Sequence, residues 1–147
     1  MGAQEPRMSP RRVASGLALV MTLAVCAGCR GADDVAGMKE LQRLRSGTVD
    51  VVLLSPREAL HQGRDTFTIE FRSTSDGSLM DVGGVKASAN MPMPGMPMFG
   101  SIDVQPASGK GRYAAASDFS MAGTWRLAIE WDGPAGRGSV SFSTSVQ

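Results

Sequence analysis

The stretch TWRLAIEW, at residues 124–131, alternates large apolar side chains with small or polar ones at every step. One phase of the alternation holds Trp125, Leu127, Ile129 and Trp131. Because successive side chains of a strand point to opposite faces of a sheet, the pattern predicts a strand with one buried face. A second stretch, SVSFSTSV at residues 139–146, repeats the pattern with serines in the outer phase.

Shorter segments of the same kind precede these two. They lie at residues 48–54, 65–73, 85–91, 102–104 and 112–116, and turn residues such as the Ser-Asp-Gly at 75–77 separate them. About seven short strands at this spacing are typical of an antiparallel sandwich of immunoglobulin type. The 18 glycines and 8 prolines among 147 residues also suit short elements and turns better than a helical bundle. We therefore predict an all-β, immunoglobulin-like sandwich over residues 48–147.

Residues 1–28 are typical of a secretory signal peptide. Three arginines precede an uncharged run at 13–28, which is shorter than the roughly 20 apolar residues of a membrane span. The run ends in Cys26-Ala-Gly-Cys29, which resembles a bacterial lipobox with Cys29 as the lipidated residue. The resemblance implies an exported protein that is lipid-anchored to the cell membrane or the outer membrane and faces the periplasm or the cell exterior.

The cysteine pair also fits a CxxC redox or metal motif, although cleavage before Cys29 would remove Cys26. Without residues 1–28 the chain holds 12 basic and 13 acidic residues. This balance provides no electrostatic footprint for nucleic acid, and it favours a lipid rather than a basic patch as the membrane anchor. Either Met1 or Met8 would serve as the start of such a signal.

Residues 29–47 are expected to be the lipidated N-terminus and a tether. Val35, Met38, Leu41 and Leu44 are spaced by three, which is compatible with a short helix. A flexible tether that lifts the domain off the bilayer is the alternative.

Methionine is unusually frequent in this chain, because its 10 residues outnumber all the aromatic residues together. Four methionines fall within eight residues, interleaved with prolines, and one more stands just before the Trp125 strand. These candidate metal ligands are Met91, Met93, Met96, Met98 and Met121. Thioether sulfur is a soft donor that favours Cu(I) or Ag(I) and keeps this ability in an oxidising compartment. In an extended chain the Met-x-Met spacing projects both sulfurs to one side.

Two other interpretations of these methionines stay open. Their side chains commonly fill irregular gaps in a core and touch aromatic rings, here the two tryptophans. A Met-rich loop also suits adaptable docking onto a partner, such as an efflux or oxidase-assembly protein, without any ion.

The chain contains few of the residues from which catalytic sites are usually built. The chain has one histidine, His61, whereas a zinc site or a hydrolase built on several histidines needs more. The Gly-Lys-Gly at 109–111 lacks the rest of a phosphate-binding loop and is expected to be a turn. We therefore expect a non-enzymatic protein, with His61 in a solvated loop or, as the alternative, as a further metal ligand.

These features together resemble the YtkA-like domain family, which is related to the FixH group. The resemblance covers about residues 48–147 and rests on the Met-Pro repeats at 91–98, on Gly111-Arg-Tyr113 and on Met121-Ala-Gly123-Thr-Trp125. It implies a small exported β-sandwich, often a lipoprotein, found near copper handling, heavy-metal efflux or respiratory-oxidase assembly. By the same resemblance the five candidate ligands named above are the family's methionine positions. The loop lacks the histidine that a Cu(II) site would favour.

Overall fold

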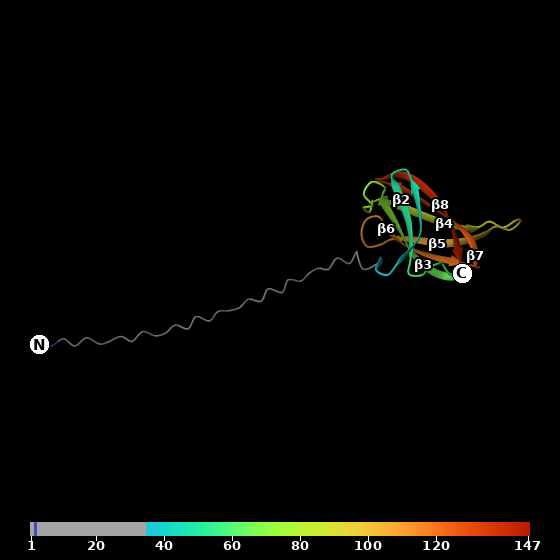
Figure 1. Cartoon of the computed structure of the whole chain (residues 1–147), viewed down its shortest axis with the longest axis horizontal. Helices are drawn as coiled ribbons and strands as arrows, with labels where there is room; N and C mark the ends of the chain where they lie inside the picture. Colours follow the sequence, from blue (N-terminus) through green and yellow to red (C-terminus); the bar gives the residue numbers. More distant parts are fainter. Residues whose placement is uncertain (1, 3–34) are drawn as a thin grey trace.

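The computed structural model describes Gly2 and residues 35–147, and this part of the chain folds into eight strands without an α-helix (Figure 1). The strands are β1 (Lys39–Ser46), β2 (Val49–Ser55), β3 (Gly63–Ser73), β4 (Gly84–Met91), β5 (Met98–Pro106), β6 (Arg112–Phe119), β7 (Gly123–Gly133) and β8 (Gly136–Val146). No helix among the described residues is long and apolar enough to span a membrane. The predicted signal peptide and Cys29 lie outside the described residues.

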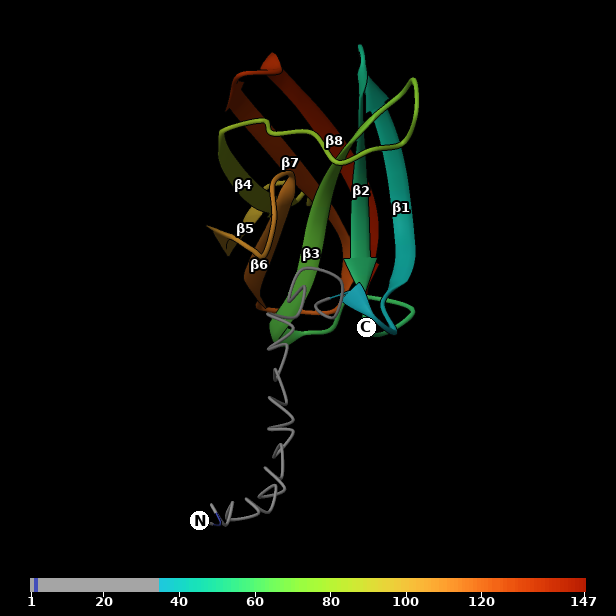
Figure 2. The same cartoon turned by 90° about the vertical axis from the view of Figure 1, so that its left-hand side faces the viewer.

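The strands form one continuous sheet that folds over into two layers. Their order is β1-β2-β3-β6-β5-β4-β7-β8, and every hydrogen-bonded pair is antiparallel. The start of β5 pairs with β4, while its later residues, from Ser101 onward, pair with β6, so that β5 crosses from one layer to the other. Figure 2 shows β7 and β8 running behind β2 and β3.

The two ends of the sheet approach each other and nearly close it. Gln42 of β1 donates a hydrogen bond from Nε2 to the backbone oxygen of Ser143 in β8, at 2.7 Å. Leu60, in the loop after β2, forms a parallel bridge with Val146 at the end of β8. These contacts shield parts of the two edge strands, whose unpaired backbone groups would otherwise be exposed to solvent.

The apolar phase of each predicted strand faces the space between the layers. Both tryptophans of β7 are buried, as their alternation predicted, and Phe71 packs its ring 5.3 Å from that of Trp131. The hydroxyl of Tyr113 donates a 2.6 Å hydrogen bond to the backbone oxygen of Gly83, and burial raises the pKa of this tyrosine. The predicted all-β, immunoglobulin-like class is therefore confirmed, with eight strands in place of about seven.

One expectation about the chain before the sandwich is wrong. Residues 39–46 form β1, not a helix or a flexible tether, so the folded domain begins at Lys39 and not at residue 48. The spacing by three suggested a helix, but pairing with β2 overrides this local preference because β2 is buried almost throughout its length. The missed signal is the turn at Gly47 and Thr48, where a glycine with φ of 59° joins two strands through a two-residue loop.

Candidate functional site

The Met-Pro repeat forms the hairpin between β4 and β5, called here the methionine hairpin (residues 91–98), which protrudes from the sandwich in Figure 1. Met91 ends β4 and Met98 begins β5, and the two residues lie directly opposite each other in the ladder. Strand pairing stops between them at prolines, which have no N–H to donate. Because opposite residues of an antiparallel pair share one face, the side chains of Met91 and Met98 lie on the same side of the sheet.

The turn that carries Met121 joins β6 to β7 and is held by two side chains. The buried indole of Trp125 donates a hydrogen bond from Nε1 to the backbone oxygen of Met121, at 3.0 Å. Gln62, from the loop before β3, donates from Nε2 to the backbone oxygen of Ser120, also at 3.0 Å. The ring of Trp125 in turn packs 5.1 Å from that of Phe119. The backbone at Met121 is therefore fixed from the core and from a neighbouring loop.

The side chain of Met91 brings the hairpin and this turn together. A Cβ atom added to Gly123 would lie 2.7 Å from the Met91 methyl carbon and 3.6 Å from its sulfur. The Met91 thioether thus packs on the first residue of β7, two positions after Met121. Only glycine leaves room for this close approach, since Gly123 also has a φ of 141°.

The five candidate methionines differ in burial. Met91 belongs to the hydrophobic core at 6% exposure, and Met93 and Met98 are half-buried against that core. Met121 is 37% exposed and Met96 is 70% exposed. The core-packing interpretation therefore describes Met91 well, whereas Met96 stands out in solvent.

The half-buried His61 lies in the loop that approaches the Met121 turn, because its neighbour Gln62 contacts Ser120. The backbone N–H of His61 donates to Oδ2 of Asp65 at 2.7 Å, which fixes the loop rather than the imidazole ring. Within the described part of the chain, no group of three or more His, Cys, Asp or Glu side chains is placed to hold a metal ion.

Two features of the surface were missed by the sequence reasoning, and the first is Phe99. Its side chain is 76% exposed, directly after Met98 at the base of the methionine hairpin. The sequence position of Phe99 could have revealed this. Neighbouring residues of a strand point to opposite faces, so Phe99 has to point outward if Met98 packs inward. Phe99 and Met96 thus expose two large apolar side chains at this end of the sandwich.

The second missed feature is an ionic cluster on the outer face of β1, β2, β3 and β6. The fully buried carboxylate of Glu70 accepts hydrogen bonds from Arg72 at 2.5 Å and from Arg112 at 2.6 Å. On the same face, a hydrogen bond from Arg45 lowers the pKa of Asp50, and one from Arg43 lowers the pKa of Glu40. Each of these four arginines has a carboxylate partner. The ion pairs of this cluster link β1 to β2 and β3 to β6.

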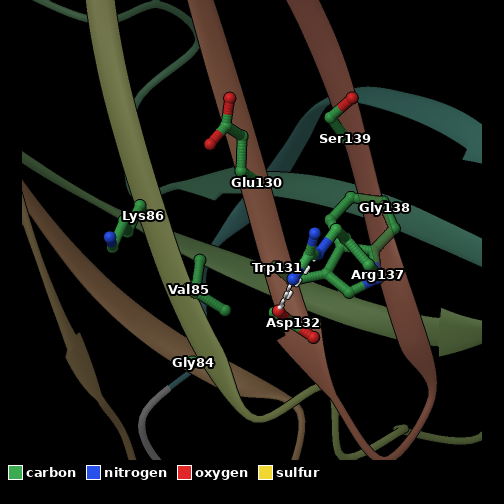
Figure 3. A pocket seen from close by; sticks show the side chains of 9 residues that line it. All are labelled: Gly84, Val85, Lys86, Glu130, Trp131, Asp132, Arg137, Gly138 and Ser139. Carbon is green, nitrogen blue, oxygen red and sulfur yellow. Dashed lines mark hydrogen bonds and ion pairs between the residues drawn. The ribbon is translucent and has the colours of Figure 1, made fainter.

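A groove of about 580 Å³ opens at the other end of β7, lined by residues of β4, β7 and β8 (Figure 3). Arg137 reaches across to Asp132 and pairs with it at 2.6 Å, as the dashed lines in Figure 3 mark. Lys86 lies opposite Glu130 in the ladder, so the charges along this groove alternate in sign. The groove therefore presents no excess of one charge, and the methionine end remains the more distinctive surface.

The comparisons with known proteins identify a family. The model of the YtkA-like family matches residues 43–130, which is more than half of the chain. Among curated proteins there is no match. Solved structures similar to this chain include the Lin-41 filamin domain, with 17% identity and a TM-score of 0.44, covering 60% of this chain and 81% of that chain. FetP from uropathogenic E. coli strain F11 has 11% identity and a TM-score of 0.47, covering 74% of this chain and 95% of that chain.

Proposed function

The chain belongs to the YtkA-like family, and on this premise we propose that it is an exported, membrane-anchored, non-enzymatic protein that binds Cu(I) or Ag(I) through methionine sulfur. The observation that carries the proposal is the joining of two methionine-bearing segments, the methionine hairpin and the Met121 turn, at one end of the sandwich. Its role would be transfer or tolerance of the ion, in copper handling or heavy-metal efflux, with Cys29 carrying the lipid.

The geometry supports a site in which some of the candidate ligands are positioned by the fold before an ion binds. Met91 and Met98 share a face of the ladder, and the hydrogen bond from Trp125 fixes the turn of Met121. Prolines on both sides of the hairpin restrict its backbone, which reduces the conformational entropy lost when thioethers close around an ion. Neutral sulfur donors favour soft monovalent cations over hard ones.

A titration of the purified mature protein with Ag(I), followed by calorimetry, tests the proposal. Changing the five candidate methionines to leucine nearly conserves side-chain volume, so the fold is expected to survive while binding is lost. The matched control changes Met38 and Met80 to leucine, because these methionines lie outside the hairpin and the turn, and it should bind like the wild type. Equal binding by the wild type and the five-site variant would refute the proposal.

The pH dependence of binding identifies the donor atoms. Thioether sulfur carries no proton, so affinity for Ag(I) should be constant between about pH 5 and pH 8, where imidazole titrates. If His61 were a ligand, His61→Ala would lower the affinity for Ag(I). A binding curve that is flat with pH in the wild type and in His61→Ala assigns the ion to sulfur.

The alternative function is a docking module for an efflux or oxidase-assembly protein that needs no metal. The exposure of Met96 and Phe99, at 70% and 76%, favours it, because exposed apolar side chains on a protruding segment are typical of contact surfaces. The variant Phe99→Ser separates the two functions: it should leave Ag(I) affinity unchanged and, if docking is the function, abolish co-purification with the partner.

A further inference from the structure

The methionine hairpin is a palindrome about its turn. Reading outward from Pro94 and Gly95, both arms have the order Met-Pro-Met. Gly95 has a φ of 80°, which fits the second central position of a type II turn that has Pro94 at the first. The ladder sets Met91 opposite Met98, and continuing that register through the prolines sets Met93 opposite Met96. The hairpin therefore holds two cross-strand methionine pairs, the inner pair (Met91 and Met98) and the outer pair (Met93 and Met96).

The two pairs have different surroundings. The inner pair sits at the rim of the sandwich, where the Met91 thioether packs on Gly123, two positions after Met121 in the turn that Trp125 fixes. The outer pair flanks the turn at the tip, where Met96 is 70% exposed and Met93 is half-buried against the core. An ion at the outer pair would be open to solvent and to other molecules, whereas an ion at the inner pair would be enclosed.

We propose, resting on the function above, that the two pairs act in sequence: the outer pair exchanges Cu(I) or Ag(I) with a partner, and the inner pair with Met121 stores it. The partner is a protein that presents a thioether or thiolate sulfur at its own surface. Exchange proceeds by associative substitution, in which the partner's sulfur forms a bond to the ion before one bond to Met96 breaks. The ion keeps its charge, and no electron is transferred.

Alternation supports a stepwise path along the hairpin. Residues two apart in an extended arm project to the same side, so Met93 stands next to Met91 and Met96 next to Met98. Consecutive thioethers on one face allow the ion to change one ligand at a time without becoming free. The prolines at the intervening positions keep both arms extended and point to the other side.

The experiment compares two double variants of the mature protein. The outer variant is Met93→Leu with Met96→Leu, and the inner variant is Met91→Leu with Met98→Leu. Ag(I) affinity is measured by calorimetry, and the transfer of bound Cu(I) to a bulky chromogenic Cu(I) chelator is followed by stopped-flow absorbance. Circular dichroism establishes that each variant is folded, and Met121→Leu, at an exposed position of the turn, provides an inner-site variant that spares the core.

We expect the outer variant to transfer Cu(I) about tenfold more slowly than the wild type and to lose less affinity than the inner variant. The inner variant and Met121→Leu should lose about tenfold in affinity, equivalent to 1.4 kcal/mol. Transfer at the wild-type rate in the outer variant, or equal losses of affinity in both double variants, would overturn the proposal. If the wild type binds no ion, the proposed function fails; if it binds and the two pairs are equivalent, only the sequential path fails.

Discussion

At the scale of the residue, Trp125 connects the hydrophobic core to the candidate site. Its indole is fully buried and packs on Phe119, and its Nε1–H donates to the backbone oxygen of Met121. One side chain therefore contributes both to the stability of the sandwich and to the position of a candidate ligand. Because buried tryptophans normally place their N–H on an acceptor, the hydrogen bond fixes where the turn must lie.

The substitution Trp125→Phe should separate these two contributions. Loss of the hydrogen bond and of part of the ring is expected to lower the free energy of unfolding by about 2 kcal/mol, measured by urea denaturation. The freed Met121 turn should also lower Ag(I) affinity, by about fivefold if 1 kcal/mol of positioning is lost.

Trp131→Phe is the matched control, since Trp131 lies on the same strand and is equally buried but stands at the far end from the methionines. It should lower stability to a similar extent and leave Ag(I) affinity unchanged. Equal effects of the two substitutions on affinity would show that Trp125 acts only through the general stability of the fold.

The sequence identified these residues but not their neighbours. The alternation in β7 predicted that both tryptophans are buried, because a two-residue period needs only local information. The contact of Met91 with Gly123 joins residues 32 positions apart in the chain, and the pairing of Glu70 with Arg112 spans 42. Such contacts depend on strand register and strand order, which no local pattern contains.

At the scale of the element, β1 shows how tertiary pairing overrides a local pattern. Its apolar residues are spaced by three, yet it pairs with β2 from Lys39 to Ser46. On the outer face of β2, Val52 is only 1% exposed and Asp50 is held by Arg45 and Arg43 of β1. Without β1, the buried β2 would become an edge strand with exposed apolar side chains and unpaired backbone groups.

A chain that begins at residue 48, where the sequence alone places the domain boundary, should therefore be much less stable than one that begins at residue 35. We expect the loss to amount to several kcal/mol, a large share of the roughly 5–15 kcal/mol of a typical domain. Urea denaturation followed by circular dichroism measures the difference. If both chains unfold at the same urea concentration, β1 is dispensable and residues 39–46 are a tether after all.

At the scale of the whole molecule, the proposed anchor limits where the methionine end can act. Nine residues separate Cys29 from the start of β1 at Lys39. A chain spans at most about 3.5 Å per residue, so the start of β1 would stay within roughly 35 Å of the bilayer surface. This confinement raises the effective concentration of the methionine hairpin toward proteins in the same membrane and lowers it toward proteins in free solution. We therefore expect the proposed exchange partner to be a membrane protein.

This arrangement depends on which cysteine carries the lipid, and the two candidates provide their own control. When the full chain is produced in bacteria fed an alkyne-labelled fatty acid, Cys29→Ala should abolish incorporation of the label, whereas Cys26→Ala should leave it intact. The reason is that Cys29 follows two small residues, as the lipobox requires, while Cys26 follows Val25. Under the proposed function, the unlabelled protein should keep its Ag(I) affinity, because Cys29 is not among the candidate ligands, and should no longer support copper tolerance in the cell. Label that persists in Cys29→Ala would remove the anchor, and with it the reason to seek the partner in the membrane.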